Sequence, residues 1–204
     1  MTLIVDYDAG NIGSVANICK KAGGRTEISS DPDRIAAAGK LILPGVGHFG
    51  RAMARLNDSG IRAALDAAHD RGVPILGICL GMQLLTKHSE EGDADGLGWV
   101  DAVTRRFVLP EPLKIPHMGW NEVAFTRSDV LTQGMEDEAR FYFVHSYYVE
   151  ALSEAAVLGR TDYGGPFVSV VQQGNVWGFQ CHPEKSHRYG LAVIRNFLDK
   201  VPAL

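Results

Sequence analysis

Short apolar runs alternate with amphipathic segments along the first half of the chain. The runs at 3–5, 40–44 and 73–78 are dominated by Leu, Ile and Val, and helical patterns cover about 12–22 and 60–70. Because polar residues do not alternate with the apolar ones, each run is expected to form a strand that is buried on both faces. Strands of this kind, separated by helices, predict an α/β fold with a mainly parallel central sheet.

The pattern changes after about residue 100, where strand-like segments follow one another closely. They cover 122–125, 139–150 and 167–180, and the last of them contains a Gln-Gly-Asn turn at 173–175 that is typical of a hairpin. We expect these segments to add an antiparallel part to the sheet. A final helix is predicted over 187–200, with an apolar stripe formed by Leu191, Ile194, Phe197 and Leu198.

Composition and charge narrow the classes of partner. The chain has 204 residues, 46% hydrophobic and 22% charged, which is typical of one globular domain spanning 1–204. The net charge of −4 and the scattered Lys and Arg residues argue against a broad surface for nucleic acid or anionic membranes, so small molecules and proteins are the expected partners. No apolar run suits a signal peptide or a membrane span, and Cys19, Cys79 and Cys181 do not form a disulfide framework. We therefore expect a cytoplasmic protein.

Cys79 occupies an unusual place, directly after an apolar run and midway between Gly77 and Gly81. This spacing is typical of a nucleophile elbow, a sharp strand-to-helix turn whose glycines relieve crowding of the backbone. A helix is expected over 80–88, and its N-terminus would favour the thiolate, which is the reactive form of cysteine. For such a motif taken alone, a buried structural cysteine is the alternative.

A cysteine nucleophile needs a base and a group that orients the base, and the segment FQCHPEKS offers both. Pro183 disfavours helical backbone at His182, so His182 and Glu184 are expected to point the same way, with the carboxylate in reach of the imidazole. Cys181 is expected to face the opposite side as a packing residue. Taken alone, the segment would be a capped turn, but beside an elbow cysteine it predicts a catalytic triad with Cys79.

Three motifs, PGVG at 44–47, GICLGMQ at 77–83 and HPEKS at 182–186, resemble in order and separation those of the class I, or triad-type, glutamine amidotransferases. The resemblance covers essentially the whole chain and implies a flavodoxin-like α/β core with a mixed, mainly parallel sheet. It also implies glutaminase chemistry without a cofactor or a metal. In that chemistry the cysteine attacks the carboxamide carbon of glutamine, the histidine moves the protons and the glutamate orients the histidine.

The same resemblance assigns roles to the other groups of the site. The backbone N–H of Val46 or Gly47 is expected to form the oxyanion hole together with the N–H of Leu80. The amino-acid end of glutamine is expected to contact four residues, which are Gly45, Gln83, Ser146 and Tyr147.

Three further stretches, DYDAGN at 6–11, KIPHMGWNEV at 114–123 and Lys185-Ser186, are similar to the glutaminase subunits of imidazole glycerol phosphate synthase, an enzyme of histidine biosynthesis. In that family the ammonia goes to a separate cyclase subunit, a (β/α)8 barrel. The resemblance implies a heterodimer with such a cyclase. Where the family usually has a DYGMGN-like segment, this chain has Asp-Ala in place of Gly-Met. The residues expected at the interface are Asn11, Trp120 and Lys185.

Two alternative functions use the same residues. One is a paralogous amidotransferase subunit that feeds ammonia to an enzyme modifying surface-polysaccharide sugars. The other is a cysteine hydrolase that acts without a partner, although such hydrolases usually carry a histidine directly after the nucleophile, where this chain has Leu80. His182 and His187 lack the further ligands of a zinc site, and the acidic segment 90–98 lacks those of a calcium loop, so the segment is expected to be a solvated loop.

Overall fold

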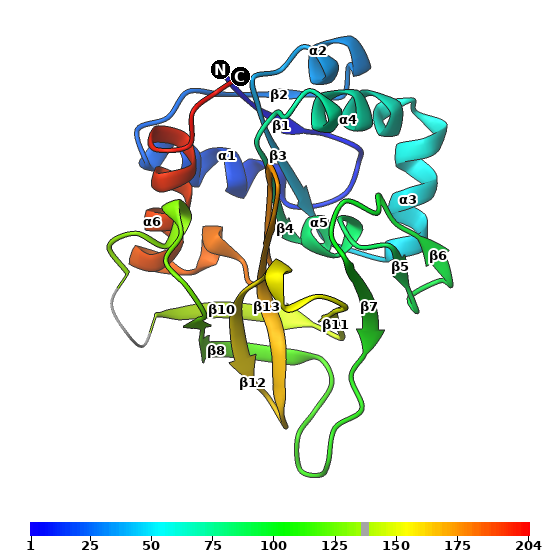
Figure 1. Cartoon of the computed structure of the whole chain (residues 1–204), viewed down its shortest axis with the longest axis vertical. Helices are drawn as coiled ribbons and strands as arrows, with labels where there is room; N and C mark the ends of the chain where they lie inside the picture. The colour runs from blue at the N-terminus through cyan, green and yellow to red at the C-terminus, as the bar shows by residue number, and fades with distance from the viewer. Residues whose placement is uncertain (136–138) are drawn as a thin grey trace.

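Five parallel strands form the centre of the molecule (Figure 1). The computed structural model describes residues 1–135 and 139–204. The five strands lie in the order β2-β1-β3-β4-β14, and every neighbouring pair is parallel. In that order their bounds are Thr26–Ser29, Thr2–Val5, Lys40–Gly45, Ile75–Cys79 and Val176–Phe179.

Helices cover both faces of these strands, as Figure 1 shows. Successive strand residues belong to two different apolar clusters, because neighbouring side chains of a strand point to opposite faces. Ile4 and Ile42 lie in the cluster with α1 and α6, whereas Leu3 and Leu41 lie in the cluster with α3 and α4. The apolar runs are thus buried on both sides, as predicted. The helices are α1 (Ile12–Lys21), α2 (Pro32–Ala36), α3 (Phe49–Asp58), α4 (Ile61–Asp70), α5 (Leu80–Leu84) and α6 (His187–Asp199).

The second half of the chain adds antiparallel strands, which confirms the predicted mixed sheet. After β14 the sheet continues through β13, β11, β7, β5 and β6, with β12 attached beside β13 and β9 beside β12. Strands β8 and β10 form a separate pair. The strands are β5 (His88–Ser89), β6 (Ala94–Asp95), β7 (Ala102–Arg106), β8 (His117–Glu122), β9 (Ala124–Phe125), β10 (Arg140–His145), β11 (Tyr147–Ala151), β12 (Val157–Asp162) and β13 (Pro166–Gln173). Three short 3-10 turns are η1 (Val130–Thr132), η2 (Glu154–Ala156) and η3 (Pro183–Lys185).

The helix after Cys79 ends at Leu84, four residues before the predicted end. The cause is a later segment that takes the carbonyl groups a longer helix would need: the N–H groups of Leu97 and Val100 donate to the carbonyls of Leu84 and Leu85, at 2.8 and 3.0 Å. A five-residue helix has a smaller dipole than the predicted one, so other groups must supply more of the charge stabilisation at Cys79.

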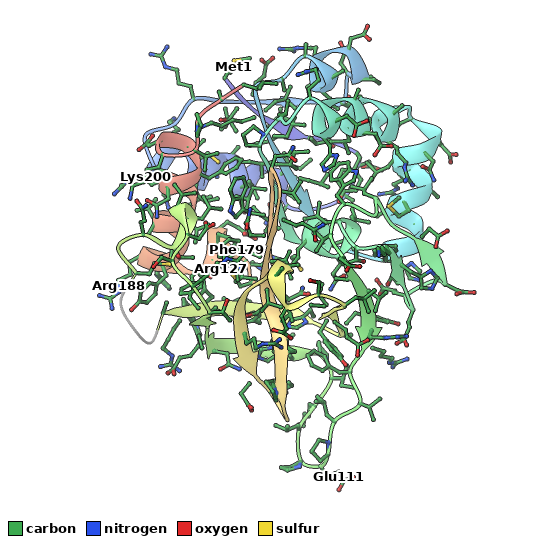
Figure 2. All side chains as sticks on the ribbon, viewed as in Figure 1. Met1, Glu111, Arg127, Phe179, Arg188 and Lys200 are labelled. Atoms are coloured by element: carbon green, nitrogen blue, oxygen red, sulfur yellow. The ribbon has the colours of Figure 1, made fainter. Side chains whose placement is uncertain are left out.

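The segment 139–150, expected to be strand throughout, is divided at Ser146. Its first part, β10, pairs with β8 in the small sheet, and its second part, β11, pairs with β7 and β13 in the large one. The loop between β7 and β8 extends to Glu111, at the end of the molecule far from Met1 (Figure 2). Within the described residues, every helix falls short of the length and apolar character needed to cross a bilayer.

Candidate active site

Cys79 ends β4 and immediately precedes α5, on a sharp turn of the backbone. Its φ of 54° and ψ of −109° lie outside the regions that non-glycine residues favour, a strain of about 1–3 kcal/mol that is characteristic of functional positions. The turn brings α5 so close to β3 that a Cβ atom at Gly81 would overlap the backbone oxygen of Leu43. The geometry is that of the predicted elbow, and glycine at 81 is a steric requirement.

A buried histidine and glutamate form a close pair next to this elbow. Nδ1 of His182 lies 2.8 Å from Oε1 of Glu184, and each side chain is only 3% exposed. His182 has extended backbone, as the following proline predicts, and Glu184 then lies in the η3 turn. Gly190 of α6 packs so tightly on this turn that a Cβ atom there would overlap the carbonyl oxygen of Pro183.

The electrostatics of His182 favour the charged imidazolium. Burial lowers the pKa of His182, but Cys79 and Glu184 together more than offset it and raise the pKa to about 10. Nε2 has no hydrogen-bond partner among the described residues, so the contact with the sulfur is looser than the contact with the carboxylate. Catalytic contacts in a ligand-free site are often loose in this way. At neutral pH the His182 ring can therefore present a positive charge beside the cysteine sulfur.

A pocket of about 250 Å³ opens at Cys79. It is smaller than sites for drug-sized ligands, roughly 300–1,000 Å³, and suits a single small metabolite. The parallel register sets Gly45 opposite Cys79, which brings the glycine-rich loop after β3 to the pocket. The residues that line it are Val46, Gly47, Cys79, Leu80, Gln83, Glu91, Pro116, Val144, His145, Ser146 and Tyr147.

The chain matches a known protein family over almost its whole length. The family model for glutamine amidotransferase class-I matches residues 3–201, which is nearly the whole chain. The chain belongs to the class I glutamine amidotransferase family. The family predicted from the three sequence motifs is thereby confirmed.

Two curated relatives of this amidotransferase match over almost their full length. The chain is 45% identical to imidazole glycerol phosphate synthase subunit HisH 2 of Methanococcus maripaludis, and the match covers 98% of this chain and 100% of the relative. It is 48% identical to imidazole glycerol phosphate synthase subunit HisH of Moorella thermoacetica, covering 97% and 94%. The resemblance to that enzyme's glutaminase subunits, drawn from the sequence, is confirmed by these relatives.

Solved structures confirm the fold class. The amidotransferase superposes on PurLQS from Thermotoga maritima with a TM-score of 0.77 at 18% identity, covering 98% of each chain. A second structure, described as a glutamine amidotransferase, gives a TM-score of 0.72 at 20% identity and covers 94% of this chain and 98% of the other.

Most predicted site residues of the amidotransferase meet at the pocket. Val46, Gly47 and Leu80 surround Cys79, and Gln83, Ser146 and Tyr147 line the same space. Gly45 lies just outside, with the hydroxyl of Tyr7 donating at 2.7 Å to the carbonyl of the preceding Pro44. Within the described parts of the chain, no three His, Cys, Asp or Glu side chains are arranged to hold a metal ion.

Two side chains near the nucleophile were not identified from the sequence. One is Gln180, fully buried, whose amide nitrogen lies 3.8 Å from the sulfur of Cys79. The signal for it was a polar residue directly after the apolar strand β14. The other is Glu91, whose segment was expected to be only a solvated loop.

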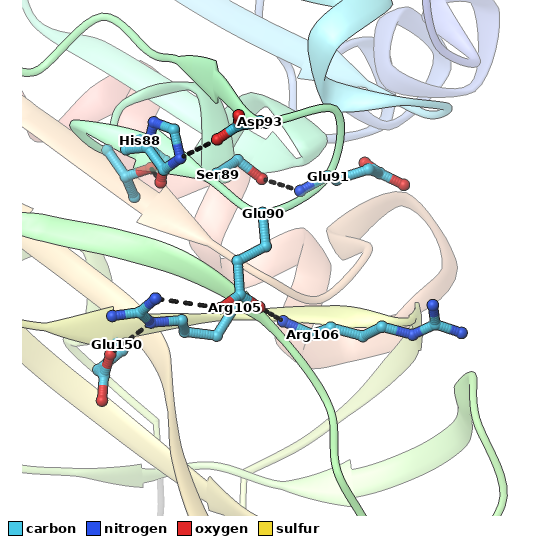
Figure 3. Close-up of polar contacts among 9 residues, drawn as sticks. His88, Ser89, Glu90, Glu91, Asp93, Arg105, Arg106 and Glu150 are labelled. Carbon is cyan, nitrogen blue, oxygen red and sulfur yellow. Dashed lines mark hydrogen bonds and ion pairs between the residues drawn. The ribbon is translucent and has the colours of Figure 1, made fainter.

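The loop that carries Glu91 is held in place by its neighbours (Figure 3). The carboxylate of Glu90 accepts hydrogen bonds from the Arg105 side chain at 3.0 Å and from the Arg106 N–H at 2.8 Å, and Ser89 Oγ accepts from the Glu91 N–H at 3.0 Å. Oε2 of Glu91 accepts from the N–H of Phe49 at 2.8 Å, at the start of α3. The loop is therefore more than a solvated connection, because it fixes a carboxylate at the pocket.

Two buried histidines form a hydrogen-bonded chain behind the pocket. His145 Nδ1 lies 2.7 Å from the carbonyl oxygen of Tyr147, which can only accept, so His145 carries its proton on Nδ1. His145 Nε2 is then an acceptor, and Nδ1 of His117, at 3.0 Å, must donate to it. Burial lowers the pKa of His117 to about 4 and that of His145 to about 3, so both rings are neutral at pH 7.

We expect this pair to make the fold sensitive to acid. An unfolded histidine binds its proton near pH 6.5, whereas His145 in the folded protein does not do so until about pH 3. Stability from the neutral ring is thus present above pH 6.5 and is lost as the pH falls, by about 2 kcal/mol per site between pH 7 and pH 5. The contribution of His182 to stability depends on pH in the opposite direction. Because its pKa is raised to about 10, that contribution is present at acid pH and is lost as the pH rises through the folded value.

Urea unfolding at pH 7 and pH 5 measures this effect. The difference in unfolding free energy between the two pH values should fall by about 2 kcal/mol in His145→Gln. It should be unchanged in Asn57→Gln, a substitution at an exposed position without a titrating group. An unchanged pH dependence in His145→Gln would contradict a neutral buried ring.

The three expected interface residues lie on exposed surface. Trp120 is 43% exposed, and its ring stacks on His187 with centroids 5.1 Å apart. Lys185 is exposed, with Nζ 5.5 Å from the ring centroid of Tyr142. The Tyr142 ring also makes a T-shaped contact with Trp120, with centroids 6.1 Å apart. Asn11 is exposed and caps the start of α1. The structure thus groups Trp120 and Lys185 around Tyr142, while Asn11 belongs to the neighbouring helix.

Proposed function

We propose that this chain is the glutaminase subunit of imidazole glycerol phosphate synthase in the cytoplasm, hydrolysing L-glutamine to glutamate and ammonia through a thioester on Cys79. The observation that carries the proposal is the buried His182–Glu184 pair beside an elbow cysteine that lines a pocket of metabolite size. The names of the full-length relatives support the choice of enzyme.

The reaction follows from the roles of the three side chains. The Cys79 thiolate attacks the carboxamide carbon of glutamine, and the N–H groups of Leu80 and of Val46 or Gly47 stabilise the negative charge that forms on its oxygen. His182 donates its Nε2 proton to the departing nitrogen, and ammonia leaves. Neutral His182 then takes a proton from water, whose oxygen attacks the glutamyl thioester and releases glutamate. The thiolate and the imidazolium are restored, with Glu184 holding the ring throughout.

Substrate orientation depends on the opposite wall of the pocket. Apart from the Cys79 thiolate, Glu91 is the one charged side chain among the described residues that line the pocket, since His145 is neutral there. Its Oε2 is engaged by the backbone of α3, and Oε1 is left to accept from an ammonium group. We assign the α-ammonium of glutamine to this position, with Gln83, Ser146, Tyr147 and the backbone at Gly45 around the rest of the amino-acid end.

The partner is a separate cyclase barrel that receives the ammonia, forming a heterodimer across Asn11, Trp120 and Lys185. Tyr142 connects this surface to the triad, because its carbonyl accepts from the His182 N–H at 2.9 Å and its own N–H donates to Ser186 Oγ at 3.0 Å. Docking at Trp120 can therefore displace the segment that carries His182.

We expect the isolated subunit to be nearly idle, because ammonia released without an acceptor would be protonated in water and lost. In this proposal the glycine-rich loop at 44–47 rests with its N–H turned away from Cys79, and docking of the ligand-bound cyclase favours the flipped peptide. Completing an oxyanion hole by one donor changes the rate about 100- to 1,000-fold. Steady-state glutaminase activity of the chain alone, with cyclase, and with cyclase plus its nucleotide ligand measures this change.

Substitutions on the exposed surface test where the cyclase binds. Trp120→Ala and Lys185→Ala should weaken both complex formation and stimulation, and Lys200→Ala, at the other end of α6 in Figure 2, should change neither. Full activity of the isolated chain would refute gating. Stimulation by a sugar-modifying enzyme in place of the cyclase would favour the paralogous amidotransferase instead.

A further inference from the structure

We propose that Gln180 is a positioning residue of this amidotransferase, whose buried amide holds Gln83 in place and donates a hydrogen bond to the sulfur of Cys79. The inference deepens the proposed glutaminase function and rests on it for the role of Gln83 at the substrate. It rests on the contacts of one side chain that is completely shielded from solvent.

The register of the sheet brings Gln180 to the nucleophile. Strand β14 runs parallel to β4 with Phe179 opposite Ile78. Gln180, directly after the end of β14, therefore comes beside Cys79, the last residue of β4. Side chains alternate along β14, and a Cβ atom at Gly178 would meet Met82 of α5, so Gln180 also points towards α5. Gln83 lies on this helix, within hydrogen-bond reach.

The orientation of both amides follows from one backbone carbonyl. The amide nitrogen of Gln83 lies 3.1 Å from the carbonyl oxygen of Tyr147, which can only accept, so the NH2 group of Gln83 faces it. The same nitrogen lies 3.0 Å from Oε1 of Gln180 and donates its second proton there. The NH2 group of Gln180 is then left facing the sulfur of Cys79, at 3.8 Å.

The histidine chain supports this assignment from the other side. The carbonyl oxygen of Tyr147 has two acceptor positions, and His145 donates to one of them at 2.7 Å while Gln83 donates to the other. Beyond His145, the ring of His117 donates in the same direction and accepts at Nε2 from the amide of Asn121, at 3.3 Å. Each hydrogen bond from Asn121 to Gln180 then has one donor and one acceptor. If the oxygen and nitrogen of either glutamine amide were exchanged, two donors or two acceptors would face each other.

Two consequences for catalysis follow. A donor at 3.8 Å from the sulfur stabilises negative charge on Cys79, which matters because α5 is too short to supply a full helix dipole. Both protons of the Gln83 amide are used inside the protein, so Oε1 of Gln83 is left as the group that can accept from the substrate. Gln180 therefore acts on the nucleophile and, through Gln83, on glutamine binding, without touching the substrate itself.

The test is the pH dependence of Cys79 alkylation by iodoacetamide, followed by mass spectrometry on the complex of the chain with its cyclase. Gln180→Met keeps a similar volume and removes both hydrogen bonds. We expect the pH of half-maximal alkylation to rise by about one unit, which is a tenfold loss of thiolate at pH values below the midpoint. The KM for glutamine should rise as well, about fivefold to tenfold, because the loss of one hydrogen bond frees Gln83.

Controls separate this role from a general effect on the fold. The same substitution at an exposed glutamine, Gln133→Met, should leave the alkylation profile of Cys79 and the KM for glutamine unchanged. If Gln180→Met does not fold, Gln180→Asn keeps a polar amide that is one methylene too short to reach both partners, and the same upward shift is expected. A folded Gln180 variant with an unchanged alkylation profile would overturn the proposal. The proposed function can fail separately. If the wild-type complex does not hydrolyse glutamine but the Gln180 variant still shows the alkylation shift, the proposed function is refuted and the contact between Gln180 and Cys79 is supported.

Discussion

Cys79→Ala is expected to abolish glutamine hydrolysis while leaving the fold and the binding of the cyclase intact. The side chain is 6% exposed and small, so its loss removes one sulfur atom and hardly changes the packing. Because no other group can form the thioester, the rate should fall by at least about 10⁴-fold, as when the nucleophile of a triad is removed. Steady-state assays measure the rate, and thermal unfolding with size-exclusion chromatography checks the fold and the complex.

Chemical labelling gives the same test without a mutation. A glutamine analogue with a chloroketone group should alkylate Cys79 and spare the other two cysteines. Burial raises the pKa of Cys19 to about 12, and burial together with the nearby Glu184 and Cys79 raises the pKa of Cys181 well above its ordinary range, so both remain thiols. Normal hydrolysis by Cys79→Ala, or a label on either of the other cysteines, would refute the triad.

His182→Ala should be nearly as damaging as the loss of the nucleophile, with a fall on the order of 10⁴-fold or more. Glu184→Ala should cost roughly 10 to 100 times less, since the orienting acid of a triad usually contributes least. The physical reason is that Glu184 acts only through the ring: its carboxylate helps to raise the pKa of His182. In Glu184→Ala the imidazolium should therefore be lost at a lower pH, which narrows the alkaline side of the pH–rate profile.

Purified variants in complex with the cyclase, assayed from pH 6 to pH 10, allow this comparison. Glu111→Ala, at the tip of the loop in Figure 2, is the matched control and should retain wild-type rates. Equal and small losses in His182→Ala and Glu184→Ala would show that the pair does not serve Cys79.

The sequence predicted the parts of the site that depend on local spacing. Two glycines around Cys79 and a proline after His182 each restrict the backbone directly, and the structure has an elbow and an extended residue at these positions. Buried strands were also recognisable, because their apolar runs lack polar alternation. These features need no information about which segments become neighbours.

Gln180 and Glu91 depend on contacts between distant segments, and this is why the sequence did not reveal them. Gln180 meets Cys79 only through the register of two strands that are about a hundred residues apart in the chain. Glu91 reaches the pocket because Arg105 and Arg106 hold the neighbouring Glu90. The early end of α5 has a similar origin, since the competing N–H groups belong to Leu97 and Val100.

The tight packing at Gly81 and Gly190 has a consequence for how this protein tolerates inherited change. Every amino acid other than glycine carries a Cβ atom, and at both positions that atom would overlap a carbonyl oxygen of the backbone. A survey of all single substitutions would score the two glycines as intolerant as Cys79, although neither takes part in the chemistry. Protein abundance separates the two kinds of position, because a replaced glycine removes the folded protein, while a replaced cysteine leaves a full amount of inactive protein.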